Sequence, residues 1–176
     1  GHYEQEFGDF DDDGDIDIYG LNWQSSLSDE TLENNGDGTF GNMQLLPGSD
    51  SDDNEGDFFD YDSDGDLDLI IANFSGQERL YENTDGQGTY ALTVGQLPVD
   101  SFSSLDVDAA DVDNDGDYDA FVANDNDAPN TFLKNLNDIT DTHAPKLYRL
   151  EQAPDRSVGP LPTVVRVQVY DNASYY

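Results

Sequence analysis

Asp9-Phe10-Asp11-Asp12-Asp13-Gly14-Asp15-Ile16-Asp17 is the stretch of sequence that decides the fold. The chain repeats it as Asp60-Tyr61-Asp62-Ser63-Asp64-Gly65-Asp66-Leu67-Asp68 and as Asp111-Val112-Asp113-Asn114-Asp115-Gly116-Asp117-Tyr118-Asp119. The copies begin at residues 9, 60 and 111, so they are 51 positions apart both times. A fixed period of this length predicts an array of tandem structural units.

The residue types in this stretch indicate a site for a hard cation. Aspartates at positions 1, 3 and 5 lie together only if the chain curls around a centre, and the glycine at position 6 permits the sharp turn because it has no Cβ. Two like unit charges 4 Å apart cost about 4 kcal/mol at an effective dielectric of 20, so such a loop needs a counter-ion. Several carboxylates suit Ca²⁺, which accepts six to eight oxygens in flexible geometry, better than Mg²⁺. Soft metals are disfavoured because the chain has no Cys and only two His, His2 and His143.

The opening of the motif is shared with the EF-hand, which is the alternative to weigh. An EF-hand requires a bidentate Glu at position 12 and a helix on each side. Position 12 is occupied by Gly20, Ile71 and Val122 in the three copies. The residues after each loop are alternating or continuously apolar, which is typical of strands. The sequence therefore excludes the EF-hand.

The candidate metal residues are the aspartates at the odd positions of the three loops. We expect position 9 to supply the closing side-chain ligand and position 7 to supply a backbone carbonyl, with the position-7 side chains facing water. Three Ca²⁺ sites are expected from this set: Asp9, Asp11, Asp13, Asp15 and Asp17; Asp60, Asp62, Asp64, Asp66 and Asp68; Asp111, Asp113, Asp115, Asp117 and Asp119.

The motif D-x-D-x-D-G-x-x-D, followed by an apolar strand at a pitch near 50, resembles the FG-GAP/VCBS-type repeats of integrin-α-like β-propellers. The resemblance covers about residues 4–140, and Phe7-Gly8 matches the FG signature. It implies an all-β fold in which each repeat is one four-stranded blade and the loop joins two strands while binding Ca²⁺ through positions 1, 3, 5 and 9. The expected organisation is three tandem blades within residues 1–142, at about 1–50, 51–101 and 102–142. A β-strand tail follows at 143–176.

Composition indicates a fold that depends on metal. The net charge is −34 and only 35% of residues are hydrophobic, which taken alone favours disorder. An aromatic content of 11% and the apolar strands argue for a folded domain. We therefore expect a domain that is folded with Ca²⁺ and loose without it. So acidic a surface excludes nucleic acid as a partner.

An extracellular location is expected, either secreted or at the cell surface. The chain has no Cys for disulfides, and bound Ca²⁺ can replace them as the stabilising cross-link. Extracellular modules bind Ca²⁺ with dissociation constants of roughly 10⁻⁴–10⁻³ M. The sequence contains no signal peptide and no apolar run long enough to span a membrane.

Pairs of acidic residues just before each loop form a second periodic feature: Glu4 and Glu6, Glu55 and Asp57, Asp106 and Asp108. Residues two apart lie on one face of a strand, so each pair forms part of an acidic ladder. One interpretation is a solvated strand face, which is the usual fate of such charges. The other is a further cation site between repeats.

The tail differs in charge from the repeats. Residues 143–176 contain four of the six basic residues, and Thr163–Tyr170 has the alternation and β-branched content of a strand. About 34 residues are too few for an independent domain. We expect self-association by strand addition of this tail, head-to-tail into a filament where the contact does not close. The alternative is that the tail begins a sandwich domain.

Function is expected to be structural or adhesive and not enzymatic. The chain has no Cys nucleophile and no G-x-S-x-G, H-E-x-x-H or phosphate-binding glycine loop. The alternative is carbohydrate binding, with Tyr19, Trp23, Phe74 and Tyr81 as candidates for stacking on sugars. The expected partners are further copies of the chain, another extracellular protein, or glycans.

Overall fold

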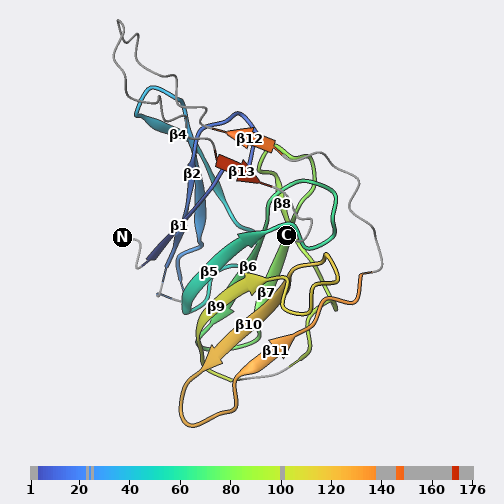
Figure 1. Cartoon of the computed structure of the whole chain (residues 1–176). Coiled ribbons are helices and arrows are strands. Elements are labelled where there is room, and N and C mark those ends of the chain that lie inside the picture. Colours follow the sequence, from blue (N-terminus) through green and yellow to red (C-terminus); the bar gives the residue numbers. More distant parts are fainter. Residues whose placement is uncertain are drawn as a thin grey trace, which may run out of the picture.

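The computed structural model describes residues 4–137 except 23, 25, 100 and 101, and the backbone of residues 146–148 and 168–170. This described part is all-β (Figure 1). The first sheet contains β1 (Glu4–Gly8), β2 (Asp17–Leu21), β3 (Glu30–Asn34) and β4 (Phe40–Leu45). The second contains β5 (Asp53–Phe59), β6 (Asp68–Asn73), β7 (Arg79–Asn83) and β8 (Tyr90–Leu92). The third contains β9 (Ser104–Ala110), β10 (Asp119–Asn124) and β11 (Thr131–Leu133).

Each sheet is an antiparallel meander in which consecutive strands are neighbours, and none of the three closes on itself. The same register recurs, since Leu69 pairs with Tyr81 as Ala120 pairs with Leu133. The prediction of an all-β array of tandem sheets is therefore confirmed. The third sheet has three strands within the described residues, where a four-stranded blade was expected.

The second sheet lies between the first and the third (Figure 1). Leu69 and Ile71 of β6 pack toward the first sheet, whereas Ile70 and Ala72 pack toward the third. Successive side chains of a strand point to opposite faces, so a strand covered on both faces needs a continuous apolar run. This explains why β6 carries such a run and why all of its residues are buried.

Aromatic rings fill the space between the first and second sheets. The ring centroids of Phe10 and Phe58 are 6.2 Å apart, and Tyr90 meets Phe10 edge-on at 6.1 Å. Tyr19 and Tyr81 are fully buried in the same cluster. Burial removes both tyrosines from the candidate sugar-stacking residues.

The acidic pair of β5 connects the second sheet to the third. The carboxylate of Glu55 accepts a hydrogen bond from the backbone N–H of Val107 (2.9 Å), and that of Asp57 accepts one from Ala109 (2.7 Å). These contacts join β5 to β9 through side chains, since the two strands belong to different sheets. A solvated strand face does not describe this pair, because its carboxylates satisfy N–H groups of the neighbouring sheet. The alternative of a further cation site between the repeats stays a prediction.

A buried polar cluster connects the first sheet to the second. Asp29 accepts hydrogen bonds from the Tyr19 hydroxyl (2.9 Å) and from a backbone N–H, and it also hydrogen-bonds to Asp53. Both oxygens of Asp53 lie within 2.9 Å of the Arg79 guanidinium. Burial, and then the negative charge of Asp53, raises the pKa of Asp29 well above its ordinary value. Asp29 is therefore the protonated member of the pair, and Asp53 keeps its charge opposite Arg79.

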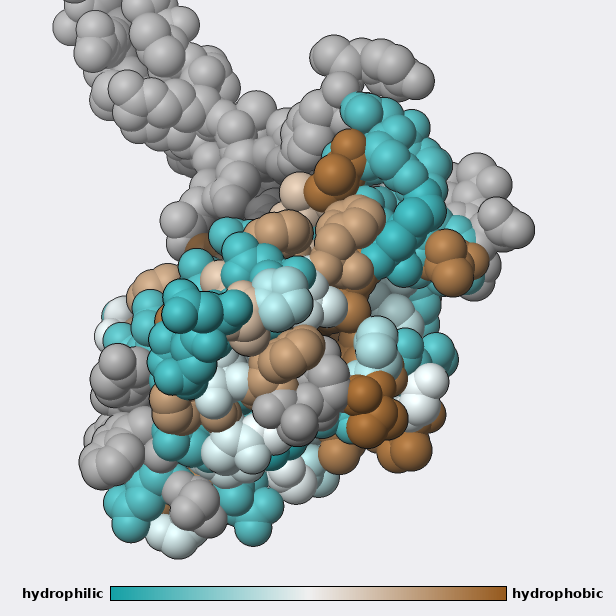
Figure 2. Space-filling model, turned by 90° about the horizontal axis from the view of Figure 1, so that it is seen from below, coloured by the Kyte–Doolittle hydropathy of each residue, from teal (hydrophilic) through white to brown (hydrophobic). Residues whose placement is uncertain are grey.

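The outer sheets leave apolar side chains exposed at the two ends of the stack. On the third sheet these are Val112 (58% exposed), Phe121 (46%) and Phe132 (45%), which we call the second end face. On the first sheet they are Phe7 and Phe40, which we call the first end face. Apolar side chains also gather in patches between hydrophilic ones on the side of the molecule seen in Figure 2. The residues of the second end face occupy positions that are covered in the second sheet. Phe121, for example, lies one repeat after Ile70, which the third sheet buries.

Two segments of the tail pair with each other. Strand β12 (Lys146–Tyr148) runs antiparallel to β13 (Gln168–Tyr170), with Leu147 opposite Val169. The strand expected over Thr163–Tyr170 is thus confirmed for its last three residues, and its remainder lies outside the described part. None of the described segments forms a helix of the length and hydrophobicity needed to cross a bilayer.

Candidate metal centres

Each acidic loop connects the first two strands of its sheet, and its backbone is left-handed at two positions. The glycine at position 6 has a φ of 95° at Gly14, 94° at Gly65 and 101° at Gly116, as expected from the motif. Position 4 is also left-handed, and short polar residues that tolerate this conformation occupy it: Asp12, Ser63 and Asn114. These two points of reversal curl each loop into a compact turn.

The aspartate at position 1 holds the turn closed. Oδ1 of Asp9 accepts a hydrogen bond from the N–H of Asp13 (3.1 Å), and Oδ2 accepts one from Gly14 (3.0 Å). Asp60 and Asp111 form the same two bonds with positions 5 and 6 of their own loops. The turn is therefore preorganised by the residue that was also predicted to bind metal.

The aspartate at position 9 ties the loop to the third strand of its sheet. In the second repeat, Asp68 accepts one hydrogen bond from the N–H of Tyr61 (3.0 Å) and another from the N–H of Asn83 (2.8 Å). Asp17 and Asp119 make the equivalent pairs of bonds in the other repeats. All three carboxylates are almost completely buried. The sequence motif did not predict this structural role, because the partner N–H lies 15 or more residues further along the chain.

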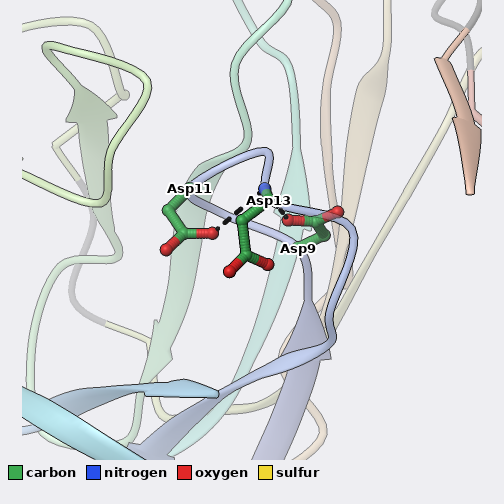
Figure 3. Close-up of side chains that lie close together, drawn as sticks. All are labelled: Asp9, Asp11 and Asp13. Atoms are coloured by element: carbon green, nitrogen blue, oxygen red, sulfur yellow. Dashed lines mark hydrogen bonds between the residues drawn. The ribbon is translucent and has the colours of Figure 1, made fainter. Parts of the chain in front are cut away.

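Three clusters of carboxylates could hold a metal ion, one in each loop. Within each cluster, one oxygen from every member lies within 4.8 Å of the others. The first cluster contains Asp9, Asp11 and Asp13, whose carboxylates gather on one side of the loop (Figure 3). The other two are Asp60, Asp62 and Asp68, and Asp111, Asp113 and Asp115. Positions 1 and 3 thus meet in every loop, whereas position 9 joins the cluster only in the second.

The aspartates at position 7 lie outside all three clusters. Asp15 and Asp66 pack against glycines of the turn after the third strand, where a Cβ on Gly86 would lie 2.6 Å from the Asp66 carboxylate. Asp117 accepts a long hydrogen bond of 3.4 Å from the hydroxyl of Ser63. Their predicted role as metal residues remains a prediction, and the geometry places these side chains against neighbouring turns.

The clusters have the electrostatics of a cation site. Burial, opposed by a hydrogen bond from Gly65 and reinforced by Asp64 and Asp62, raises the pKa of Asp60 to about 6. Burial likewise raises the pKa of Asp9 to about 6. Oδ1 of Asp62 is buried and has no hydrogen-bond partner in the described part of the chain. Orphaned and crowded carboxylate oxygens are the donors that a hard cation such as Ca²⁺ satisfies, so these residues fit that ion.

Each of the first two loops is also held by the repeat that follows it. The side-chain amide of Asn83 donates to the carbonyl of Phe10 (2.8 Å), and that of Asn135 donates to the carbonyl of Tyr61 (2.7 Å). Gln87 and Asn137 donate to the carbonyls at position 3 of the same loops. These amides were missed from the sequence, although Asn83 and Asn135 occupy matching positions at or just after the end of the third strand. A loop is therefore part of the contact between two sheets.

The family comparison agrees with this geometry. The sequence profile of the FG-GAP-like repeat matches residues 9–71 and again residues 60–122. The chain belongs to the FG-GAP-like repeat family. Together the two matches span all three acidic loops and the strands between them, which confirms the resemblance seen in the motif. Among curated proteins, none matches this FG-GAP-like chain.

Proposed function

We propose that the chain is a non-enzymatic, extracellular structural or adhesion module stabilised by Ca²⁺. The supporting observation is that each acidic cluster of the first two repeats lies in a loop held by two sheets at once. An ion bound in such a loop stabilises the contact between the two sheets as well as the loop itself. Metal binding then supplies folding free energy that the small apolar cores lack.

Calorimetric titration of the metal-free protein with Ca²⁺ tests this function. We expect measurable binding heat with dissociation constants of roughly 10⁻⁴–10⁻³ M, and weaker binding of Mg²⁺. Asp62→Asn should weaken binding at the second loop, because it removes a charge from the cluster. Asp50→Asn is the matched control, since it removes the same charge at an exposed position outside the loops. Absence of heat together with an unchanged circular dichroism spectrum in EDTA would refute the proposal.

Self-association is the second part of the proposal, with another copy of this chain covering the end faces. The supporting observation is a difference between equivalent glycines. A Cβ at Gly88 would lie 2.6 Å from the ring of Phe10, which fills the space in front of it. Gly38 is the equivalent residue of the first sheet, and nothing lies within 4 Å of its Cβ position. Val112, which is equivalent to Phe10, is exposed on the second end face and suits this space in a second copy.

The acidic pair of β9 supports the same head-to-tail contact. Asp106 and Asp108 are exposed and occupy the positions of Glu55 and Asp57, which accept N–H groups of the next sheet. In a second copy, the matching N–H groups belong to β1. When the second end face of each copy contacts the first end face of the other, two copies form a closed ring of six sheets. This number lies in the range of four to eight blades that is typical of β-propellers. A contact that does not close grows into a filament.

Light scattering in the presence of Ca²⁺ tests the contact. We expect the wild type to form a dimer or a larger species and Phe121→Asp to be monomeric, because the substitution places a charge on an apolar face that must lose water. Val94→Asp introduces the same charge at a residue that is 91% exposed and outside both end faces, so it should leave the mass unchanged. A monomeric wild type at every concentration would exclude self-association. An assembled Phe121→Asp variant would exclude these faces and leave the tail as the contact.

A further inference from the structure

The three acidic loops differ in the charge of one residue that acts on the cluster from beyond the motif. In each repeat, the backbone N–H of an asparagine donates to the position-9 aspartate. The residue just before this asparagine is Glu33 in the first repeat, Glu82 in the second and Lys134 in the third. The charge at this position is therefore negative twice and positive once. The nine-residue motif itself gives no sign of this difference, because the position lies 14 to 16 residues beyond its end.

In the first two repeats the extra charge adds to the acidic cluster. The negative charge of Glu33 is among the causes that raise the pKa of Asp11, after burial and Asp13. Glu82 acts in the same direction on Asp62, after burial and Asp64. In both loops the negative charge of this glutamate consequently adds to that of the acidic cluster.

In the third repeat an ammonium group already lies at the cluster. Nζ of Lys134 is 3.0 Å from Oδ2 of Asp115 and makes a second, closer ion pair with Asp113. These are the aspartates at positions 3 and 5, and together with Asp111 they make up the third candidate metal cluster. One side chain of the protein thus supplies positive charge to two of the three members.

We propose that Lys134 acts as a built-in counter-ion, so that the third loop is organised without metal and binds Ca²⁺ more weakly than the first two loops. The inference rests on the proposed Ca²⁺ binding and specifies how it is distributed. An incoming ion must displace the ammonium group and break both ion pairs, whereas in the other loops it meets an additional carboxylate. The third loop is also the one that no following sheet covers within the described residues, and an internal cation maintains its shape there.

Charge exchange at the equivalent positions tests the proposal by equilibrium dialysis of Ca²⁺. We expect the wild type to bind two ions tightly and a third about tenfold more weakly, as two partly exposed ion pairs and one missing carboxylate imply. Lys134→Glu should make the three affinities similar, and Glu82→Lys should leave only one tight site. Lys134→Arg, which keeps the positive charge, is the matched control and should behave as the wild type.

Thermal unfolding in excess EDTA provides a readout that is independent of binding. Lys134→Glu should lower the melting temperature because the third loop loses its internal cation, and Glu82→Lys should raise it. Three equal sites in the wild type, or no change in either measurement for Lys134→Glu, would overturn the role of Lys134 and leave the proposed function intact. Failure of every variant to bind Ca²⁺ would overturn both.

Discussion

Removal of Ca²⁺ is expected to lower the free energy of unfolding by about 3–5 kcal/mol relative to the protein in about 10 mM Ca²⁺. An ion that binds only the folded state stabilises it by RT ln(1 + [L]/Kd), which is about 1.4–2.7 kcal/mol per site when [L] is 10–100 times Kd. The first two loops together account for the expected range. A loss of this size is a large fraction of the stability of a typical domain, so the metal-free protein should be marginally folded.

Urea denaturation with and without EDTA measures this effect. The net charge of −34 adds to it, because self-repulsion of the compact state increases when the ions are removed. Sodium chloride at high concentration should restore only the part of the lost stability that comes from repulsion between surface charges. Buried carboxylates are screened much less by salt. Equal midpoints in Ca²⁺ and in EDTA would contradict the prediction.

Asp53→Ala should destabilise the protein by about 3–5 kcal/mol, the second largest effect we expect. The substitution leaves the guanidinium of Arg79, whose side chain is 14% exposed, without the carboxylate that lies 2.7 Å from it. Removing one partner of a buried ion pair costs this much because an uncompensated charge stays buried. The cluster also joins β2 and the residue before β3 in the first sheet to β5 and β7 of the second, so the damage should fall on the contact between sheets. Chemical denaturation in saturating Ca²⁺ measures it separately from metal binding.

Asp29→Asn is the matched control, because Asp29 is the protonated member of the same pair. Its pKa is raised in the folded state, so its contribution to stability is fully present below its unfolded pKa and is lost as pH rises through the folded pKa. An asparagine has no proton to lose, so the variant should be close to the wild type below about pH 4, the ordinary pKa of Asp, and increasingly more stable than it as the pH rises. A parallel pH dependence of the two proteins would show that Asp29 is not the titrating group.

Local sequence determined much of this architecture. The glycine at position 6, the crowded aspartates and the apolar run after each loop act within a few residues of one another, so the turn, the strand and the repeat could all be predicted. The same local chemistry identified the three carboxylate clusters. Position 3 of every loop, represented by Asp11, is found where the motif places it.

Contacts between repeats were beyond prediction from the motif because their partners lie roughly 50–75 residues apart in the sequence. Glu55 and Asp57 look like surface charges until β9 is placed beside β5, where they accept its N–H groups. Asn83 looks like a turn residue until its amide reaches the carbonyl of Phe10. The residues of one loop thus predict by themselves a carboxylate cluster that could hold a cation. Only the tertiary structure decided which charge each loop meets, because the pairing of β10 with β11 within one sheet brings Lys134, which directly follows β11, to Asp113 and Asp115.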